Sequence, residues 1–412
     1  MIDTAAPAIR RGTSEFRRAN LAFFLAAFVT FASLYSVQPL LPIFAAEFGL
    51  DAGTSSLSLS ATTAILAVAL LLASWVSDRL GRRRLMVWAI LSTAALGLIL
   101  PLLPTWPALV AVRAVMGLTL AGLPAVAMVY LAEELDPDAL GFSMGLYIGG
   151  TAIGGMAGRL LSGVLADWIG WRPALMVLGI AIAIAAAAVV ILLPPQRRSR
   201  PQAVPLPRLA RLIALQFRDP GLPWLFASAF LLMGSFVTLY NYAGFRLALP
   251  PFDLSHAAIS AIFVVYLLGS LSSTWAGGLS QRLGRRRVYW VMVLVMAIGI
   301  ALTGLPFTWG VILGLAVATM GYFAAHGIAS AWVTRRAQQG RAQASALYMF
   351  AYYLGSSVLG TLGGFAWTGW SWPGVLLVSG GAITLALAIG LGLTRLPVLP
   401  VPEQPPEPPS AA

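Results

Sequence analysis

Residues 77–84 read SDRLGRRR, and residues 280–287 read SQRLGRRR. The two strings lie 203 positions apart and differ only where Asp78 is replaced by Gln281. Other matches follow at nearly the same spacing, since Leu-Tyr at 146–147 recurs at 347–348 and Trp171 recurs as Trp372. The chain therefore consists of two copies of one unit, joined head to tail.

Composition places both copies in a membrane. Hydrophobic residues make up 59% of the 412 residues and charged residues only 10%, whereas soluble domains carry roughly 25% charged residues. The chain has no cysteine and only two histidines, so we expect neither a disulfide framework nor a metal centre. The chain contains no GxxxxGK[ST] phosphate loop, which argues against an ATP-driven pump. We expect no cofactor.

The apolar runs are long enough to cross a bilayer, which takes about 20 residues of helix. The first run is longer than a signal peptide and lacks a small-residue cleavage pattern, so we expect it to be retained as a span. The sequence predicts an all-α membrane protein with twelve transmembrane helices in two pseudo-symmetric six-helix bundles. The predicted spans are 19–46, 54–77, 85–103, 106–131, 141–166, 171–194, 222–247, 256–280, 287–306, 308–332, 343–368 and 372–396.

The arginines predict the orientation of these spans. If twelve spans alternate, most arginines fall in loops on one side of the membrane, together with both termini. Loops rich in basic residues stay in the cytoplasm, so the net charge of +12 indicates orientation rather than nucleic-acid binding. The predicted organisation is a cytoplasmic segment at 1–18, a bundle at 19–194, a cytoplasmic linker at 195–221, a second bundle at 222–396 and a disordered proline-rich tail at 397–412.

The repeated string resembles the loop between spans two and three of the major facilitator superfamily. Its first copy matches that pattern of acid, glycine and basic residues, although Ser74 stands where the leading glycine is usual. The second copy has that glycine, Gly277, but lacks the acid. The residues assigned to a cytoplasmic gate are Asp78, Arg79, Gly81, Arg82, Arg83 and Glu133 in the first copy, and Gln281, Arg282, Gly284, Arg285 and Arg286 in the second.

The resemblance implies that this cluster latches the cytoplasmic gate by bridging the two halves in the outward-open state. Arg82 lies one turn after Asp78 and can pair with it, and Glu133 is a further acceptor. Alternatively, the arginines only hold the topology. Gln281 carries no charge, so we expect the second copy to keep its orienting role and to lack the switch.

Spans four and five extend the resemblance. Arg113 and Gly117 form the Arg-x-x-x-Gly element of span four. The glycines of span five are similar to the drug/proton antiporter signature, but the chain departs from it at Arg159, where proline is usual. The strings LYSVQPLLP at 34–42, GGMAGRLLSG at 154–163 and YNYAGFRLALPPF at 240–252 resemble a bacterial inner-membrane subgroup of efflux proteins, the YnfM type. The resemblance implies close helix packing at Gly117, Gly154, Gly158 and Gly163.

Two arginines lie within the spans. Arg113 and Arg159 are each about seven residues, roughly 10 Å, inside the outer ends of their helices. Ionisable groups within spans are costly and mark function, so we expect the two to share one cavity and to bind an anionic substrate. Alternatively, each bonds backbone carbonyls and only fixes the packing. We expect the polar and aromatic residues at the same level, Tyr35, Gln38, Tyr240 and Asn241, to line the cavity.

The predicted function is secondary active transport by alternating access, with proton-coupled efflux of a small organic solute across the bacterial inner membrane by a monomer. No acid lies in the middle of a span, so the candidates for coupling are Asp78, Glu47 and His326, an imidazole that titrates near neutral pH. An organic-anion exchanger or uniporter using Arg113 and Arg159 remains an alternative. An intramembrane hydrolase is disfavoured because the sequence has no GxSG motif, and we expect no enzymatic activity.

Overall fold

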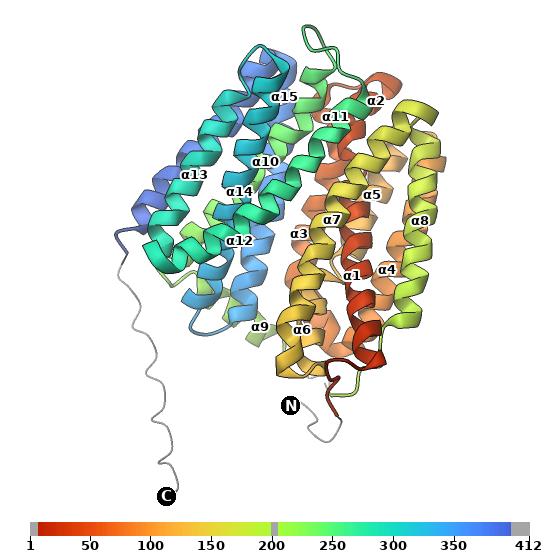
Figure 1. Cartoon of the computed structure of the whole chain (residues 1–412), viewed down its shortest axis with the longest axis vertical. Helices are drawn as coiled ribbons and strands as arrows, with labels where there is room; N and C mark the ends of the chain where they lie inside the picture. Colours follow the sequence, from red (N-terminus) through yellow and green to blue (C-terminus); the bar gives the residue numbers. More distant parts are fainter. Residues whose placement is uncertain (1–6, 199–204, 397–412) are drawn as a thin grey trace, which may run out of the picture.

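The computed structural model describes residues 7–198 and 205–396. Two groups of long helices stand side by side, one formed by the first half of the chain and one by the second (Figure 1). Throughout the described residues the elements are helical, apart from a single bridge between Ile9 and Leu135. The first described residues and the end of α15 lie toward the same end of the molecule, called here the termini end (Figure 1).

The first bundle holds the helices of residues 14–192. They are α1 (Ser14–Tyr35), η1 (Gln38–Leu40), α2 (Leu41–Phe48), α3 (Ala52–Leu80), α4 (Arg82–Ile99), η2 (Leu100–Leu102), α5 (Trp106–Leu120), α6 (Pro124–Glu134), α7 (Pro137–Ile169) and α8 (Trp171–Leu192). A short helix that the sequence did not predict, α9 (Leu206–Gln216), lies within the linker.

The second bundle repeats this order from residue 222. Its elements are α10 (Leu222–Leu247), α11 (His256–Ala261), η3 (Ile262–Val265), α12 (Tyr266–Leu283), α13 (Arg285–Leu302), α14 (Thr308–Arg336) and α15 (Arg341–Leu393). The tail predicted at 397–412 lies outside the described residues.

Nine helices within the described residues are long and apolar enough to cross a membrane. Three further crossings are consistent with the twelve predicted spans. The fourth span is divided between α5 and α6, and α13 begins with three arginines. Helix α15 has 53 residues, about 80 Å of helix, which is too long for one crossing, and its backbone is non-helical at Trp370 and Ser371.

Glycine explains part of the repeated string. Gly81 lies between α3 and α4 with φ of 88°, and Gly284 lies between α12 and α13 with φ of 85°. A side chain is strained at such positive φ values, which glycine adopts freely. Each string therefore reverses the chain at the same point of its own half.

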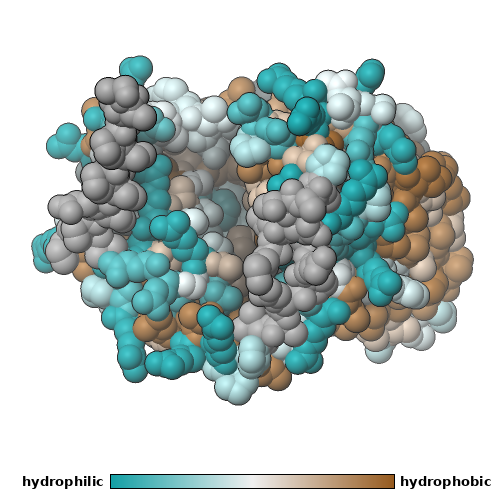
Figure 2. All heavy atoms as spheres, turned by 90° about the horizontal axis from the view of Figure 1, so that it is seen from below, coloured by the Kyte–Doolittle hydropathy of each residue, from teal (hydrophilic) through white to brown (hydrophobic). Residues whose placement is uncertain are grey.

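The flanks of the molecule suit a bilayer. Large apolar side chains such as Ile191, Leu271 and Leu377 are exposed on the outer faces of the helices. Seen from the termini end, hydrophilic residues gather on the face and hydrophobic residues on the flank (Figure 2). This pattern is the one expected of helices that expose their sides to lipid and their loops to water.

The halves meet at the end opposite the termini. Ser357 and Thr361 of α15 donate to the carbonyl and hydroxyl oxygens of Ser60 in α3, at 2.8 and 2.9 Å. Near them, Gly364 packs directly on the backbone of Gly53. In the described parts of the chain, Gln38 also joins the halves by donating a hydrogen bond to Asn241. The termini end is hollowed between the halves (Figure 2), so the structure is open at that end.

Glycines allow the helices within the first half to approach closely. Gly154 and Gly158 of α7 lie against the backbone of α1 at Phe28 and Ala32, where a Cβ atom would clash. Gly117 of α5 meets the carbonyl of Thr62 in the same way. Gly163 contacts Ser260 of the other half, so this glycine packs across the interface.

Replacing Gly154 with alanine should therefore loosen the first bundle. Overpacking of this kind costs about 1–3 kcal/mol, so we expect a lower unfolding temperature for the purified Gly154→Ala protein. Gly141→Ala is the control, because Gly141 lies on the same helix and a Cβ atom added there would meet nothing within 4 Å. It should be neutral or stabilising. Equal unfolding temperatures for the two variants would contradict the packing role.

Candidate functional site

A cavity of about 470 Å³ lies between the halves, a size typical of small-molecule sites. Helices α1 and α7 line one side, and α10, α12, α14 and α15 line the other. Most of the lining is aromatic or thioether. These side chains are Phe31, Tyr35, Met233, Phe236, Tyr266, Tyr322, Phe323, His326, Met349, Tyr352 and Tyr353.

Arg159 is the one arginine or carboxylate residue among those that line this cavity. Its Nε donates to Gln38 Oε1 at 2.5 Å and its Nη1 to the carbonyl of Gly155 at 2.7 Å. The guanidinium carbon lies 3.8 Å from the ring centroid of Tyr35 and 4.7 Å from that of Tyr266. Across the described residues, Arg159 forms no ion pair with a carboxylate. The cavity therefore has a positive pole held between aromatic faces.

Arg113 lies elsewhere, so the expectation that the two arginines share a cavity is wrong for this structure. Its side chain is fully buried and donates to the carbonyls of Ser58, Ser33 and Leu34 at 2.7, 3.0 and 2.7 Å. These bonds tie α5 to α3 and α1. The alternative, in which the arginine bonds backbone carbonyls and fixes the packing, describes this geometry.

Gln38 and Asn241 join the two halves beyond the cavity, on the side away from the termini. Gln38 Nε2 donates to Asn241 Oδ1 at 2.7 Å, and the two residues are 203 positions apart, as are the copies of the arginine string. The amide of Gln38 thus joins Arg159 to the other half. Tyr240 bonds Thr319 Oγ1 at 2.6 Å. None of Gln38, Asn241 and Tyr240 lines the central cavity, although the sequence predicted that they would.

His326 lines the cavity within a group of tyrosines. Its Nδ1 lies 3.0 Å from the hydroxyl of Tyr348, and its ring centroid is 4.8 Å from that of Tyr352. Tyr322 donates to the hydroxyl of Tyr352 at 2.7 Å. The partner of Nδ1 is a tyrosine rather than a serine, which does not support the hydrolase alternative.

The sequence missed two important lining residues, Phe236 and Tyr266. Phe236 stacks on Tyr322 with centroids 3.9 Å apart, and Tyr266 packs beside Arg159. The spacing of Tyr322 and His326, four residues apart on one face of α14, was a signal for the aromatic wall. Nothing comparable singles out Phe236 or Tyr266 from the many aromatic residues that face lipid.

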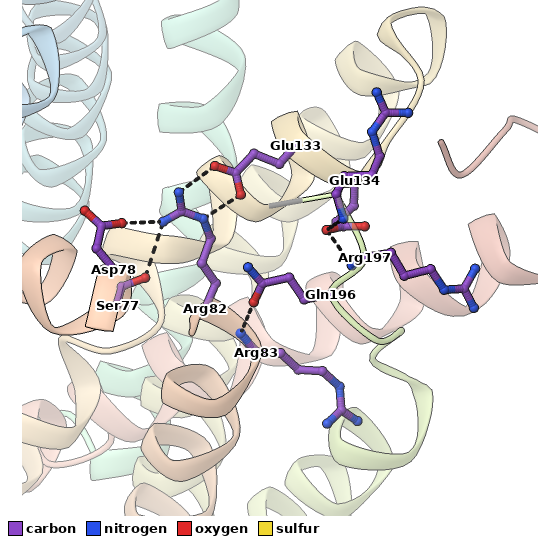
Figure 3. Close-up of polar contacts among 9 residues, drawn as sticks. Ser77, Asp78, Arg82, Arg83, Glu133, Glu134, Gln196 and Arg197 are labelled. Atoms are coloured by element: carbon purple, nitrogen blue, oxygen red, sulfur yellow. Dashed lines mark hydrogen bonds and ion pairs between the residues drawn. The ribbon is translucent and has the colours of Figure 1, made fainter. Parts of the chain in front are cut away.

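The first copy of the arginine string forms an ion-pair cluster at the termini end (Figure 3). Arg82 donates from Nη1 to Asp78 Oδ1 at 3.2 Å, and from Nε and Nη2 to the two oxygens of Glu133 at 2.6 and 2.5 Å. Such a two-point arginine–carboxylate contact is strong and directional. Burial raises the pKa of Asp78, and the nearby Arg82 opposes that shift. The cluster lies entirely within the first half.

The second arginine after the glycine in each string, Arg83 or Arg286, donates hydrogen bonds to the backbone that follows the last helix of its own bundle. Arg83 donates to the carbonyls of Leu193 and Pro194, after α8, at 3.3 and 3.2 Å. Arg286 donates to the carbonyl of Thr394, after α15, at 2.9 Å. This shared contact gives a structural reason for the repeat. Of the remaining members, Arg79 stacks over Trp75 and Arg282 is exposed.

The second copy does not repeat the ion pairs. Arg285 occupies the place of Arg82, but it forms no ion pair with any residue that the structure describes. It lines a polar cavity of about 620 Å³ with Gln281 and Arg335. In the repeat, the position that corresponds to Glu133 falls within two residues of Arg335, where the second copy has no carboxylate. Ser273 lines this cavity and the central one, so the two adjoin.

Comparison with known proteins identifies the family. The family model of the Major Facilitator Superfamily matches residues 23–250 and 231–412. The chain is 44% identical to the inner membrane transport protein YnfM of Escherichia coli, over 94% of this chain and 93% of that protein. It is 42% identical to the uncharacterized MFS-type transporter YybF of Bacillus subtilis, over 94% and 95%. The crystal structure of a mutant of the nucleoside transporter NupG superposes with a TM-score of 0.73 at 17% identity, covering 92% of this chain and 100% of that chain.

The different surroundings of the two arginines predict different effects on stability. Arg113→Gln should remove three buried hydrogen bonds from a charged donor to backbone carbonyls, at about 1.5–3 kcal/mol each, and should lower the unfolding temperature strongly. Arg159→Gln should lower it much less, because Arg159 borders a cavity that water can fill. Thermal unfolding of the two purified variants measures the difference. Equal losses would contradict the packing role of Arg113.

Proposed function

Since the chain belongs to the major facilitator superfamily and is a membrane transporter by its relatives, we propose that it exports a small organic solute by alternating access, driven by protons. The observation that carries this proposal is the cavity between the halves, which is open at the termini end and closed at the other. A site enclosed by two pseudo-symmetric bundles can face each side in turn when the bundles rock. Both bundles belong to one chain, so a monomer can complete the cycle.

The closed end is held by contacts that can break. The hydrogen bonds that Ser60 accepts from α15 and the one that Gln38 donates to Asn241 join the halves, and each is worth only about 1 kcal/mol net. The glycines at 53 and 364 bring two backbones together without interlocking side chains. Rocking has to separate α15 from α3 at this end and to break these hydrogen bonds, while the packing inside each half persists.

The arginine-rich loops and the relatives support a location. The termini end carries both arginine strings, and basic loops face the cytoplasm. The relative from Escherichia coli is described as an inner membrane transport protein. We place this chain in the inner membrane of a bacterium, with both termini in the cytoplasm. The structure then corresponds to a state that is open to the cytoplasm.

The ion-pair cluster of Arg82 supports a latch in the opposite state. In the present, open state Asp78 and Glu133 satisfy Arg82 within the first half. When the termini end closes, these charged groups face the second half and stabilise the closed gate. Burial already favours protonation of Asp78, so a proton that reaches Asp78 in the closed state neutralises the latch, and it leaves to the cytoplasm once the termini end opens. His326, in the cavity wall, is the second candidate for proton transfer.

A second mode of coupling is favoured by the cavity itself. Arg159 is the charged residue of its lining, and no carboxylate accompanies it there. A proton antiporter needs a group that exchanges a proton for the cargo. Export of an anion needs no such group, because the membrane potential of a cell with a negative interior drives one negative charge outward by about 2.3 kcal/mol for each 100 mV. Anion exchange or uniport through Arg159 is therefore the alternative to proton-coupled export.

Spin labels can test the rocking motion. The natural chain contains no cysteine, so introduced cysteines are labelled cleanly. One pair, Arg84→Cys with Arg287→Cys, reports on the termini end, and the other, Thr105→Cys with Thr308→Cys, on the opposite end. When the pH of reconstituted protein is changed, we expect the distances at the two ends to change in opposite directions. Distances that change together, or not at all under any condition or added solute, would refute alternating access.

Asp78→Asn tests the latch in the same labelled protein. The variant should reduce the population with a short distance between positions 84 and 287 on the order of tenfold, because the neutral amide cannot stabilise the closed gate. Gln281→Asn is the matched control at the corresponding position and should leave the distribution unchanged. Both variants should insert and fold normally. An unaltered distribution in Asp78→Asn would eliminate the latch.

A further inference from the structure

We infer that the cargo is an organic monoanion with a flat apolar body, such as an aromatic carboxylate, whose charged group binds at Arg159. This inference rests on the proposed transport function and adds to it the chemical class of the cargo. It follows from three features of the described residues: an arginine without a carboxylate, a wall of aromatic rings, and an access route that carries positive charge.

The charge of Arg159 has no counter-ion in the described parts of the chain. Its hydrogen-bond acceptors, which include Gln38 and the carbonyl of Gly155, are neutral. The hydroxyl of Tyr266, whose ring lies 4.7 Å from the guanidinium carbon, is buried without a hydrogen-bond partner. An anionic group that reached both the guanidinium and this hydroxyl would accept hydrogen bonds from each of them. A cation at this place would be repelled, and a neutral solute would leave the arginine uncompensated.

The rest of the cavity selects for a flat body. The stacked rings of Phe236 and Tyr322 and the ring of Tyr352 form its wall, with the flexible side chains of Met233 and Met349 beside them. Aromatic faces bind planar rings by offset stacking or edge contacts, and methionine adapts to varied shapes. The volume of about 470 Å³ leaves room for a cargo of one or two fused rings.

The route from the termini end is suited to anions. The adjoining polar cavity contains Arg285 and Arg335 and no carboxylate in its lining, and Ser273 belongs to both cavities. A cleft lined by one sign of charge raises the local concentration of the opposite ion. An acid at position 281 would neutralise Arg285, as Asp78 neutralises Arg82. The missing acid of the second copy thus keeps this route positive.

The test compares three probes of one shape and different charge. Binding of 2-naphthoate, 2-naphthamide and 2-naphthylmethylammonium to the full chain in lipid nanodiscs is measured by calorimetry at neutral pH. We expect the carboxylate to bind about tenfold or more tightly than the amide, and the ammonium ion least. Cyclohexanecarboxylate, which keeps the charge without the planar ring, should bind more weakly than 2-naphthoate.

Variants assign the effect to the residues. Arg159→Gln should reduce the preference for the carboxylate over the amide to about twofold or less, and Arg159→Lys should retain part of it because the charge remains. The control is Arg172→Gln, which removes the same charge from an exposed ion pair with Glu47 outside the cavity. It should leave the preference for the carboxylate over the amide unchanged. Gln281→Asp should slow association of 2-naphthoate several-fold at low salt and less at high salt.

The outcomes separate this inference from the transport proposal. Equal binding of carboxylate and amide, no binding of the carboxylate, or an unchanged preference in both Arg159 variants overturns the assignment of the cargo. Those results leave alternating access standing if the spin-label distances still shift in opposite directions. If 2-naphthoate binds as expected while the distances never shift, the cargo site holds and the transport proposal fails.

Discussion

The bilayer interior forces every buried guanidinium to find partners inside the protein, and the three inner arginines of the first half do so in three ways. Arg113 bonds three backbone carbonyls and joins helices. Arg82, at the membrane edge, bonds two carboxylates. Arg159 has only neutral partners and borders a cavity. Because charge in a low-dielectric medium is costly, the kind of partner separates Arg113, which packs helices, from Arg82, for which we propose a gating role, and from Arg159, for which we propose cargo binding.

The duplication gives each half the same frame, and small departures from it give the halves different roles. Arg83 and Arg286 make equivalent contacts with the ends of their bundles, which maintains the repeat. The acid at 78 and the glutamine at 281 make the corresponding loops unequal. Gln38 and Asn241, equivalent in the repeat, meet across the interface, and the amide of Gln38 also accepts from Arg159. Arg159 therefore shares its hydrogen-bond partner, Gln38, with the contact that joins the halves.

Much of the fold could be predicted, because length and hydropathy are properties of single segments. The repeat and the long apolar segments can be read along the chain, and nine helices in the described residues are long and apolar enough to cross a membrane. The pairing of Asp78 with Arg82 also follows from local spacing. By contrast, α9 was missed because arginines interrupt its apolar residues, which therefore form no run long enough for a span. The division of the fourth span depends on local backbone geometry at residues 121–123.

By itself, the sequence determined that this is a twice-repeated helical membrane protein, how its loops are charged, and how deep each polar residue lies in its span. Only the tertiary structure decided which way those residues face. Arg113 and Arg159 have similar depths, yet one is enclosed among α1, α3 and α5 and the other borders the cavity. Depth follows from counting residues at 1.5 Å each, but rotation about the helix axis is set by which neighbouring helices pack on each face.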